Sequence, residues 1–190
     1  SDEDIIFIDE FADNVVYQAF AGSSGSLDID ATTVYSGSAS LRVSVPGTGY
    51  VGGAMIDPIE RNLSSFNAIT FWARASKNII LDVAGIGNDN TGTSQYTAEV
   101  DGLSLTTTWQ QYMIPIPLAE KLIFEDGLFH FAEGSDGSAF EIWFDDIVFD
   151  SVPTITNPRP SISTQTLFVE PGATITPIDG TVVFNVDGTD

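Results

Sequence analysis

The chain has 190 residues, of which 43% are hydrophobic and 11% aromatic, a composition typical of a globular domain rather than a disordered chain. Its 27 acidic residues outnumber 6 basic ones, and the formal net charge of −21 disfavours nucleic acid, anionic lipid and sulfated or uronic polysaccharides as partners. The absence of cysteine excludes disulfides, thiolate zinc sites and cysteine nucleophiles, and a single histidine excludes a multi-histidine metal site. Neutral ligands and oxygen-bound cations remain, with calcium the best candidate.

The first residues and the apolar runs bear on targeting. No apolar run approaches the roughly 18 residues of a membrane-spanning helix, so we expect no membrane insertion. Residues 1–8 lack the basic and apolar regions of a signal peptide. Because the chain also lacks an initiator methionine, we expect it to be a mature or excised piece of a longer protein with further domains.

The pattern along the chain is that of short β-strands separated by turns rich in Gly, Ser and Asn. Residues 40–45, for example, place Leu41, Val43 and Val45 on one face and polar residues on the other. Strands are predicted, in chain order, at 5–13, 40–45, 68–76, 78–86, 95–100, 110–116, 128–132 and 141–150. Pro115 and Pro117 indicate an edge strand, and only residues 118–124 favour a short helical turn.

Many short strands without a helix to cover a sheet predict an all-β fold, a two-sheet antiparallel β-sandwich of the jelly-roll type, over residues 1–150. Residues 151–160 contain three prolines and are typical of a linker. Residues 161–190 contain strand-like pieces around a Pro-Gly turn and look like the start of an immunoglobulin-like domain. Whether this tail is disordered, pairs with a neighbour or packs on the first domain stays open.

Five motifs in a fixed order resemble a known family. They are IIFIDEFAD (5–13), YSGSASLRV (35–43), AITFWARAS (68–76), TTTWQQYMIPI (106–116) and IWFDDIVF (142–149). Together, over about residues 5–150, they resemble the β-sandwich, galactose-binding-like carbohydrate-binding modules attached to glycoside hydrolases or to bacterial surface glycan-binding proteins. The stretches at 87–96 and 128–134 look like versions found in polysaccharide-degrading Bacteroidetes proteins. The resemblance implies a polysaccharide or oligosaccharide partner and a secreted or bacterial cell-surface location.

Two adjacent aspartates, Asp145 and Asp146, interrupt the last predicted strand, where aspartate is disfavoured. A buried carboxylate normally finds a cation or becomes neutral. Because neighbouring strand residues point to opposite faces, we expect one of the two to face an ion and the other to cap a loop or meet solvent. The alternative is that both simply mark the end of a strand.

The resemblance implies a structural calcium that joins the first strand, the loop before residue 40 and the last strand. On this pattern Asp145 supplies a side chain, and backbone oxygens come from Glu10 and from near Ser36 and Ala39. The family's acidic side chain on the first strand falls on an alanine, residue 12. Asp13, or alternatively Asp9, would have to take its place.

Sugar binding requires aromatic platforms and planar hydrogen-bonding groups. Tyr50 lies where relatives often show such a platform. His130 alternates with Phe129 and Phe131, so if these two are core residues we expect His130 to face outward into a binding cleft; the alternative is an ordinary polar residue. Further candidates, each of which is otherwise an ordinary strand or turn residue, are Asp82, Asn88, Asp89, Asn90, Gln95, Tyr96 and Glu133.

The tryptophans divide into two groups. Trp109 is expected to be structural, as its counterpart in the family is. Trp72 and Trp143 alternate with apolar residues of their strands, so we expect them on the outer face of a sheet, exposed or covered by residues 151–190; the alternative is a role in ligand binding.

No enzymatic motif emerges. The Glu-x-Asp-x-x-Glu strand motif of laminarinase-type sandwich hydrolases, a nucleophile elbow and a phosphate loop are all missing from the sequence. We therefore expect a non-catalytic module that binds a neutral polysaccharide, with a β-glucan such as laminarin as the best guess, and that carries a structural calcium. The alternative is a calcium-stabilised structural or adhesive module of a multidomain surface protein.

Overall fold

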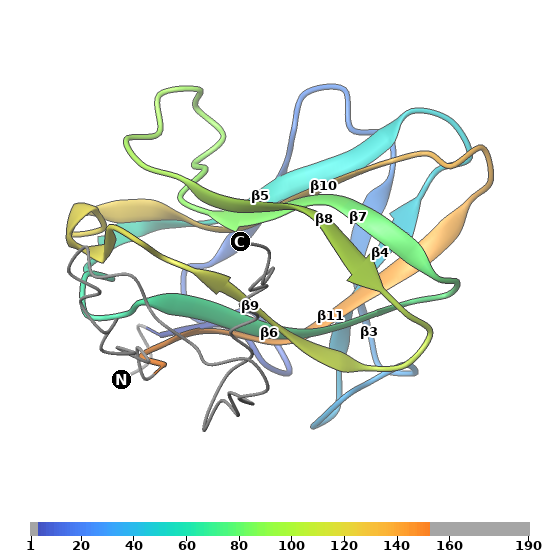
Figure 1. The fold of residues 1–190 in the computed structure, drawn as a ribbon, viewed down its shortest axis with the longest axis horizontal. Helices are drawn as coiled ribbons and strands as arrows, with labels where there is room; N and C mark the ends of the chain where they lie inside the picture. The colour runs from blue at the N-terminus through green and yellow to red at the C-terminus, as the bar shows by residue number, and fades with distance from the viewer. Residues whose placement is uncertain (1–3, 153–190) are drawn as a thin grey trace, which may run out of the picture. The chain divides into compact units, whose positions relative to one another are not determined.

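The computed structural model describes residues 4–152, which form two packed antiparallel sheets and contain no α-helix (Figure 1). Sheet A contains β1 (Ile5–Phe7), β3 (Ser26–Asp30), β4 (Ser40–Val45), β6 (Ala68–Ala75), β9 (Gln110–Pro115) and β11 (Phe140–Asp150). Sheet B contains β2 (Val16–Ala19), β5 (Tyr50–Arg61), β7 (Ile79–Ile86), β8 (Ala98–Leu105) and β10 (Glu125–Gly134). The predicted all-β jelly-roll sandwich is confirmed.

The strand order places β11 and β10 near the middle of their sheets. Sheet A runs β3-β4-β11-β6-β9, with β1 also paired to β11, and sheet B runs β2-β5-β10-β7-β8. The proline-containing β9 is an edge strand, as predicted, and the short helical turn is a single 3₁₀ turn, η1 (Ala119–Lys121). Across residues 4–152 we find no helix with the length and hydrophobicity to cross a membrane.

Aromatic rings from both sheets form the centre of the core. Phe71 and Phe144 from sheet A meet Phe129 and Phe131 from sheet B, with ring centroids 5.1–6.4 Å apart. The apolar face predicted for residues 40–45 is buried in the same core. Because side chains alternate along each strand, the residues between these core positions lie on the two outer faces of the sandwich.

Three strands were not predicted: β2, β3 and β5. The last is the longest strand of sheet B, although it contains Gly52, Gly53 and Pro58, which weaken a strand pattern. A Cβ on Gly53 would lie 2.5 Å from the Tyr17 ring, so glycine is what allows this ring to pack against the strand. The first strand was expected over residues 5–13 but ends at Phe7. The predicted linker and tail, apart from Ser151 and Val152, lie outside the described residues.

Candidate functional site

The loop before β4, residues 35–39, is held by carboxylates from two other segments. Asp145 of β11 accepts hydrogen bonds from the backbone N–H groups of Tyr35 (2.9 Å) and Ser36 (3.3 Å). Asp9, which follows β1, accepts from the N–H groups of Ser38 and Ala39, the latter at 3.1 Å. The three segments that the family resemblance joins through calcium therefore lie together in this structure.

The two acids of the loop region differ in environment. Asp145 is fully buried, and burial raises the pKa of its carboxyl even though three backbone N–H groups donate to it. The backbone hydrogen bonds from Ser38 and Ala39 lower the pKa of Asp9. A carboxylate has about four acceptor positions, so the three donors leave Asp145 about one free position.

Asp146 corrects the argument from strand alternation. We expected one of the two aspartates to face an ion and the other to cap a loop or meet solvent, and Asp146 does cap a loop: its carboxylate accepts a hydrogen bond from the Ser36 hydroxyl at 2.9 Å. Asp145 contacts the same loop, so the two carboxylates are not separated as strict alternation predicts. Asp146 has φ of +46°, and the pairing of β11 with β6 shifts between residues 145 and 148. This irregularity lets adjacent side chains reach the same loop.

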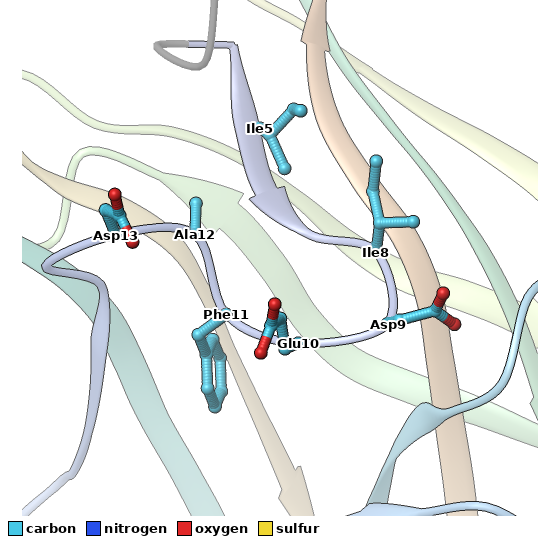
Figure 2. Close-up of a pocket in the computed structure, with 7 residues that line it drawn as sticks. All are labelled: Ile5, Ile8, Asp9, Glu10, Phe11, Ala12 and Asp13. Carbon is cyan, nitrogen blue, oxygen red and sulfur yellow. The ribbon is translucent and has the colours of Figure 1, made fainter.

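A cavity of about 340 Å³ lies beside the first strand, and Figure 2 shows the residues that line it: Ile5, Ile8, Asp9, Glu10, Phe11, Ala12 and Asp13. Asp9 and Asp13 lie on opposite sides of the loop that follows β1 and do not point toward each other. Asp9 is the one that contacts the loop, whereas Asp13 is exposed. Within residues 4–152 no group of three or more His or acidic side chains converges on one point, so a calcium here would depend largely on backbone oxygens.

All the predicted ligand-binding residues lie on sheet B or on the loop between β7 and β8. Glu133 lies at the C-terminal end of β10, close to Tyr50 of β5 and Asp82 of β7. His130 lies in the middle of β10. The remaining ones, Asn88, Asp89, Asn90, Gln95 and Tyr96, lie on the β7–β8 loop. The structure thus brings the candidates to one sheet but not to one point.

His130 is on the outer face of sheet B, as its alternation with two buried phenylalanines predicted, but the expectation that it faces into an open cleft is wrong. It is only 1% exposed. Its ring extends over Gly85, where a Cβ would come within 2.7 Å of it, and Nε2 lies 2.8 Å from the Glu99 carboxylate. Burial lowers the pKa of His130, and the hydrogen bond with Glu99 opposes this shift. The other ring nitrogen, Nδ1, is buried without a hydrogen-bond partner within residues 4–152. Glu99, with its side chain 42% exposed, is the member of the pair that solvent reaches.

Asp82 and Glu133 are linked through their backbones. The N–H of Asp82 donates to Glu133 Oε2 at 2.8 Å, and the N–H of Gly134 donates to Asp82 Oδ2 at 2.8 Å. Asp82 is exposed, whereas Glu133 is buried, and burial raises the pKa of Glu133 to about 7. Beside them the Tyr50 hydroxyl donates to the carbonyl of Ala21 at 2.6 Å, which fixes the ring at this end of the sheet.

The β7–β8 loop is organised by its own side chains. Asp89 accepts from the N–H and hydroxyl of Thr91 and from the hydroxyl of Ser94. Asn90 donates to the carbonyl of Ala19 on β2, the opposite edge of the sheet, at 3.4 Å. The loop therefore reaches across sheet B, and Figure 1 shows it rising on the side away from sheet A. Tyr96 accepts from the N–H of Leu118 at 3.1 Å.

Beyond His130, toward Tyr50, the outer face of sheet B presents groups that a ligand can contact. Ala132 is half-buried between its neighbours Gly52 and Val83, while Asp82, Glu99 and Asp101 are exposed. We call Tyr50, Asp82, Glu99, Asp101 and Ala132 the open half of sheet B. Sequence reasoning missed Glu99 and Asp101, because the pairing of β7 with β8 that places them on this face was not predicted.

The outer face of sheet A carries all three tryptophans. Tyr35 stacks on Trp72, with ring centroids 3.7 Å apart and planes at 14°, and Trp109 meets the Tyr35 ring edge-on at 6.0 Å. Trp143 is 8% exposed, and its indole N–H donates to Asp30 at 2.8 Å. The predicted outward position of Trp72 and Trp143 is correct; the contribution of Tyr35 was not predicted, because it comes from a distant loop.

Comparison with known proteins identifies the fold of this chain. No family model matches the chain, and no curated protein sequence does. Among solved structures, the family 30 carbohydrate-binding module of a cellulosomal cellulase of Clostridium thermocellum is 20% identical, with a TM-score of 0.54 over 79% of this chain and 98% of that one. A family 11 module of a Clostridium thermocellum cellulase is 16% identical, with a TM-score of 0.54 over 78% and 94%. A family 11 module in complex with a β-1,3-1,4-mixed-linked tetrasaccharide is 14% identical, with a TM-score of 0.53 over 80% and 97%. These likenesses confirm the predicted resemblance at the level of the fold.

Proposed function

We propose that this protein is a non-catalytic carbohydrate-binding module, secreted or at a bacterial cell surface, that binds a neutral polysaccharide on the open half of sheet B. The observation that carries the proposal is that this surface combines a flat centre with exposed hydrogen-bond acceptors around it. Its centre, at Ala132 and the adjacent Gly52, has small side chains that allow a flat ring to approach the backbone. Around the centre stand exposed carboxylates that accept hydrogen bonds from sugar hydroxyls.

The ligand class follows from charge and from the fold. A chain with a net charge of −21 repels polyanions, whereas neutral sugars approach freely. A solved module of the same fold holds a β-1,3-1,4-mixed-linked tetrasaccharide, which supports a β-glucan as the ligand. We therefore propose a β-glucan, such as laminarin or a mixed-linked glucan.

The test is affinity electrophoresis and calorimetry against neutral and anionic glycans. Wild-type protein is expected to bind at least one neutral β-glucan, and Glu99→Ala to weaken binding about tenfold by removing an exposed acceptor. Asp28→Ala is the matched control, because it removes an exposed carboxylate from sheet A. Failure to bind any glycan, with a normal melting curve, would refute the proposal and favour a structural or adhesive module.

We also propose a structural calcium where β1, residues 35–39 and β11 meet. The buried Asp145 carboxylate, with about one acceptor position free, would bind it together with backbone oxygens of Glu10, Ser36 and Ala39. Of the two acids that follow β1, Asp9 fits better than Asp13, since it already contacts the loop. Calcium would neutralise a buried charge and cross-link three segments. Chelation is expected to lower the melting temperature, and calcium to restore it; a melting curve indifferent to both would refute the site.

A further inference from the structure

The outer face of sheet A carries a cluster of aromatic and polar side chains that the proposed function leaves unused. It consists of Tyr35, Trp72, Arg74, Trp109 and Gln111, and we call it the aromatic patch. Trp72 and Arg74 are alternate residues of β6, so both point outward, and Gln111 of β9 pairs with Trp72. Trp109 directly precedes β9, and Tyr35 comes from the loop before β4.

Tyr35 is fixed in place from two directions. Its ring stacks on Trp72 at 3.7 Å, and its backbone N–H donates to the buried Asp145 carboxylate at 2.9 Å. Tyr35 is nevertheless 39% exposed, so part of the residue remains accessible to a ligand. A ring held rigidly loses little conformational entropy when a flat ligand stacks on it.

Arg74 lies two residues after Trp72 on β6, on the same outer face of sheet A. Its guanidinium lies over Trp143, 5.4 Å from the ring centroid, and its Nε is buried without a hydrogen-bond partner within residues 4–152. Two other basic groups have carboxylate partners: Arg61 bonds Asp57 at 2.7 Å, and Lys77 lies 3.2 Å from Asp136. Lys121, like Arg74, lies over an aromatic ring, 5.9 Å from the centroid of Tyr96. Arg74 is therefore held over an aromatic face rather than against an acid, and the terminal N–H groups of its half-buried guanidinium can donate to a ligand.

A ligand that fits both features has a flat apolar face and several oxygen acceptors, which is the chemistry of a pyranose ring. We infer that the aromatic patch is a second sugar-binding site, in which a ring stacks on Tyr35 while its oxygens accept hydrogen bonds from Arg74 and Gln111. The inference rests on the proposed carbohydrate-binding function and adds to it a site on the opposite sheet. Two sites on opposite faces allow one module to contact two glycan chains at once.

Tryptophan fluorescence tests this site selectively, because all three tryptophans lie on the outer side of sheet A and none lies on sheet B. Wild-type protein, Glu99→Ala, Tyr35→Ala and Arg74→Gln are titrated with oligosaccharides of laminarin and mixed-linked β-glucan, and with an oligomer of galacturonic acid. Emission and calorimetric stoichiometry are recorded together. Comparing the titration with galacturonate to those with neutral oligosaccharides distinguishes whether Arg74 binds a sugar carboxylate or the oxygens of a neutral sugar.

We expect a saturable change of emission in wild type that Glu99→Ala preserves, and two sugars bound per chain. Tyr35→Ala and Arg74→Gln should each weaken the fluorescent phase about tenfold and leave one calorimetric site. If sugar binds without any change in tryptophan emission, and Glu99→Ala weakens that binding about tenfold, the inference is overturned and the proposed function on sheet B is kept. A single fluorescent site, insensitive to Glu99→Ala, would keep the inference and refute the sheet B site. No binding of any sugar would refute both.

Discussion

Replacing Glu133 by glutamine is expected to stabilise the protein above neutral pH and to leave its stability near pH 4.5 almost unchanged. The Glu133 side chain is 1% exposed. Burial raises the pKa of its carboxyl from 4.5 to about 7; the hydrogen bond from the Asp82 N–H opposes the rise, and the charges of Asp82 and Asp136 add to it. Glutamine keeps an oxygen for the Asp82 N–H but carries no charge.

The direction follows from proton binding. A carboxyl whose pKa is higher in the folded than in the unfolded chain binds its proton more tightly when folded, so its contribution to stability is fully present below pH 4.5. This contribution is lost as the pH rises from 4.5 to about 7. The difference between the two pKa values corresponds to a loss of about 3 kcal/mol in the free energy of unfolding. Because glutamine stays neutral throughout, the variant should exceed wild type by up to about 3 kcal/mol at about pH 8.

The assay is urea unfolding at several pH values between about 4.5 and 8, followed by tryptophan emission. Glu120→Gln is the control, because it removes one negative charge from an exposed position of η1. The difference between Glu133→Gln and wild type should grow with pH, and the difference for the control should stay small. A Glu133→Gln difference that does not change with pH would refute the assignment of a buried, high-pKa carboxyl.

Two further substitutions test individual contacts. Gly85→Ala places a Cβ within 2.7 Å of the His130 ring and the Glu99 side chain. This clash should destabilise the protein by about 1–3 kcal/mol, measured by thermal unfolding. An unchanged melting temperature would contradict the packing of His130 over Gly85. Asp57→Ala removes the carboxylate that lies 2.7 Å from the buried Arg61 guanidinium. The free energy of unfolding, measured in urea, should fall by about 3–5 kcal/mol. A fall of less than about 1 kcal/mol would show that this pair is effectively exposed.

The core and the sheet class were predictable from local pattern. The alternation of Leu41, Val43 and Val45 identified a buried face, and the same period placed Phe129 and Phe131 in the core with His130 on the other side. Prolines likewise marked the edge strand β9. These features depend only on the two-residue period of a strand and on the missing N–H of proline, both of which are local properties.

Local pattern failed where a neighbouring strand decides the outcome. The direction of the His130 side chain followed from its own strand, but its burial depends on the bare backbone of Gly85 and on Glu99, one and two strands away. The glycines of β5 argued against a strand, yet the Tyr17 ring of β2 requires one of them. In both cases the missing information was which residues lie side by side across the sheet.

For Asp145 and Asp146 of β11, too, part of the outcome was predictable from the sequence and part was not. Sequence by itself determined that Asp145 belongs to a strand of the sandwich and that a buried carboxylate there needs partners. Only the tertiary structure decided which partners those are, because a bulge turns Asp146 onto the loop that Asp145 binds. That loop, 110 residues earlier in the chain, carries Tyr35 onto Trp72. Contacts of such sequence separation are set by the packing of the whole sandwich, and a strand's own period holds no information about them.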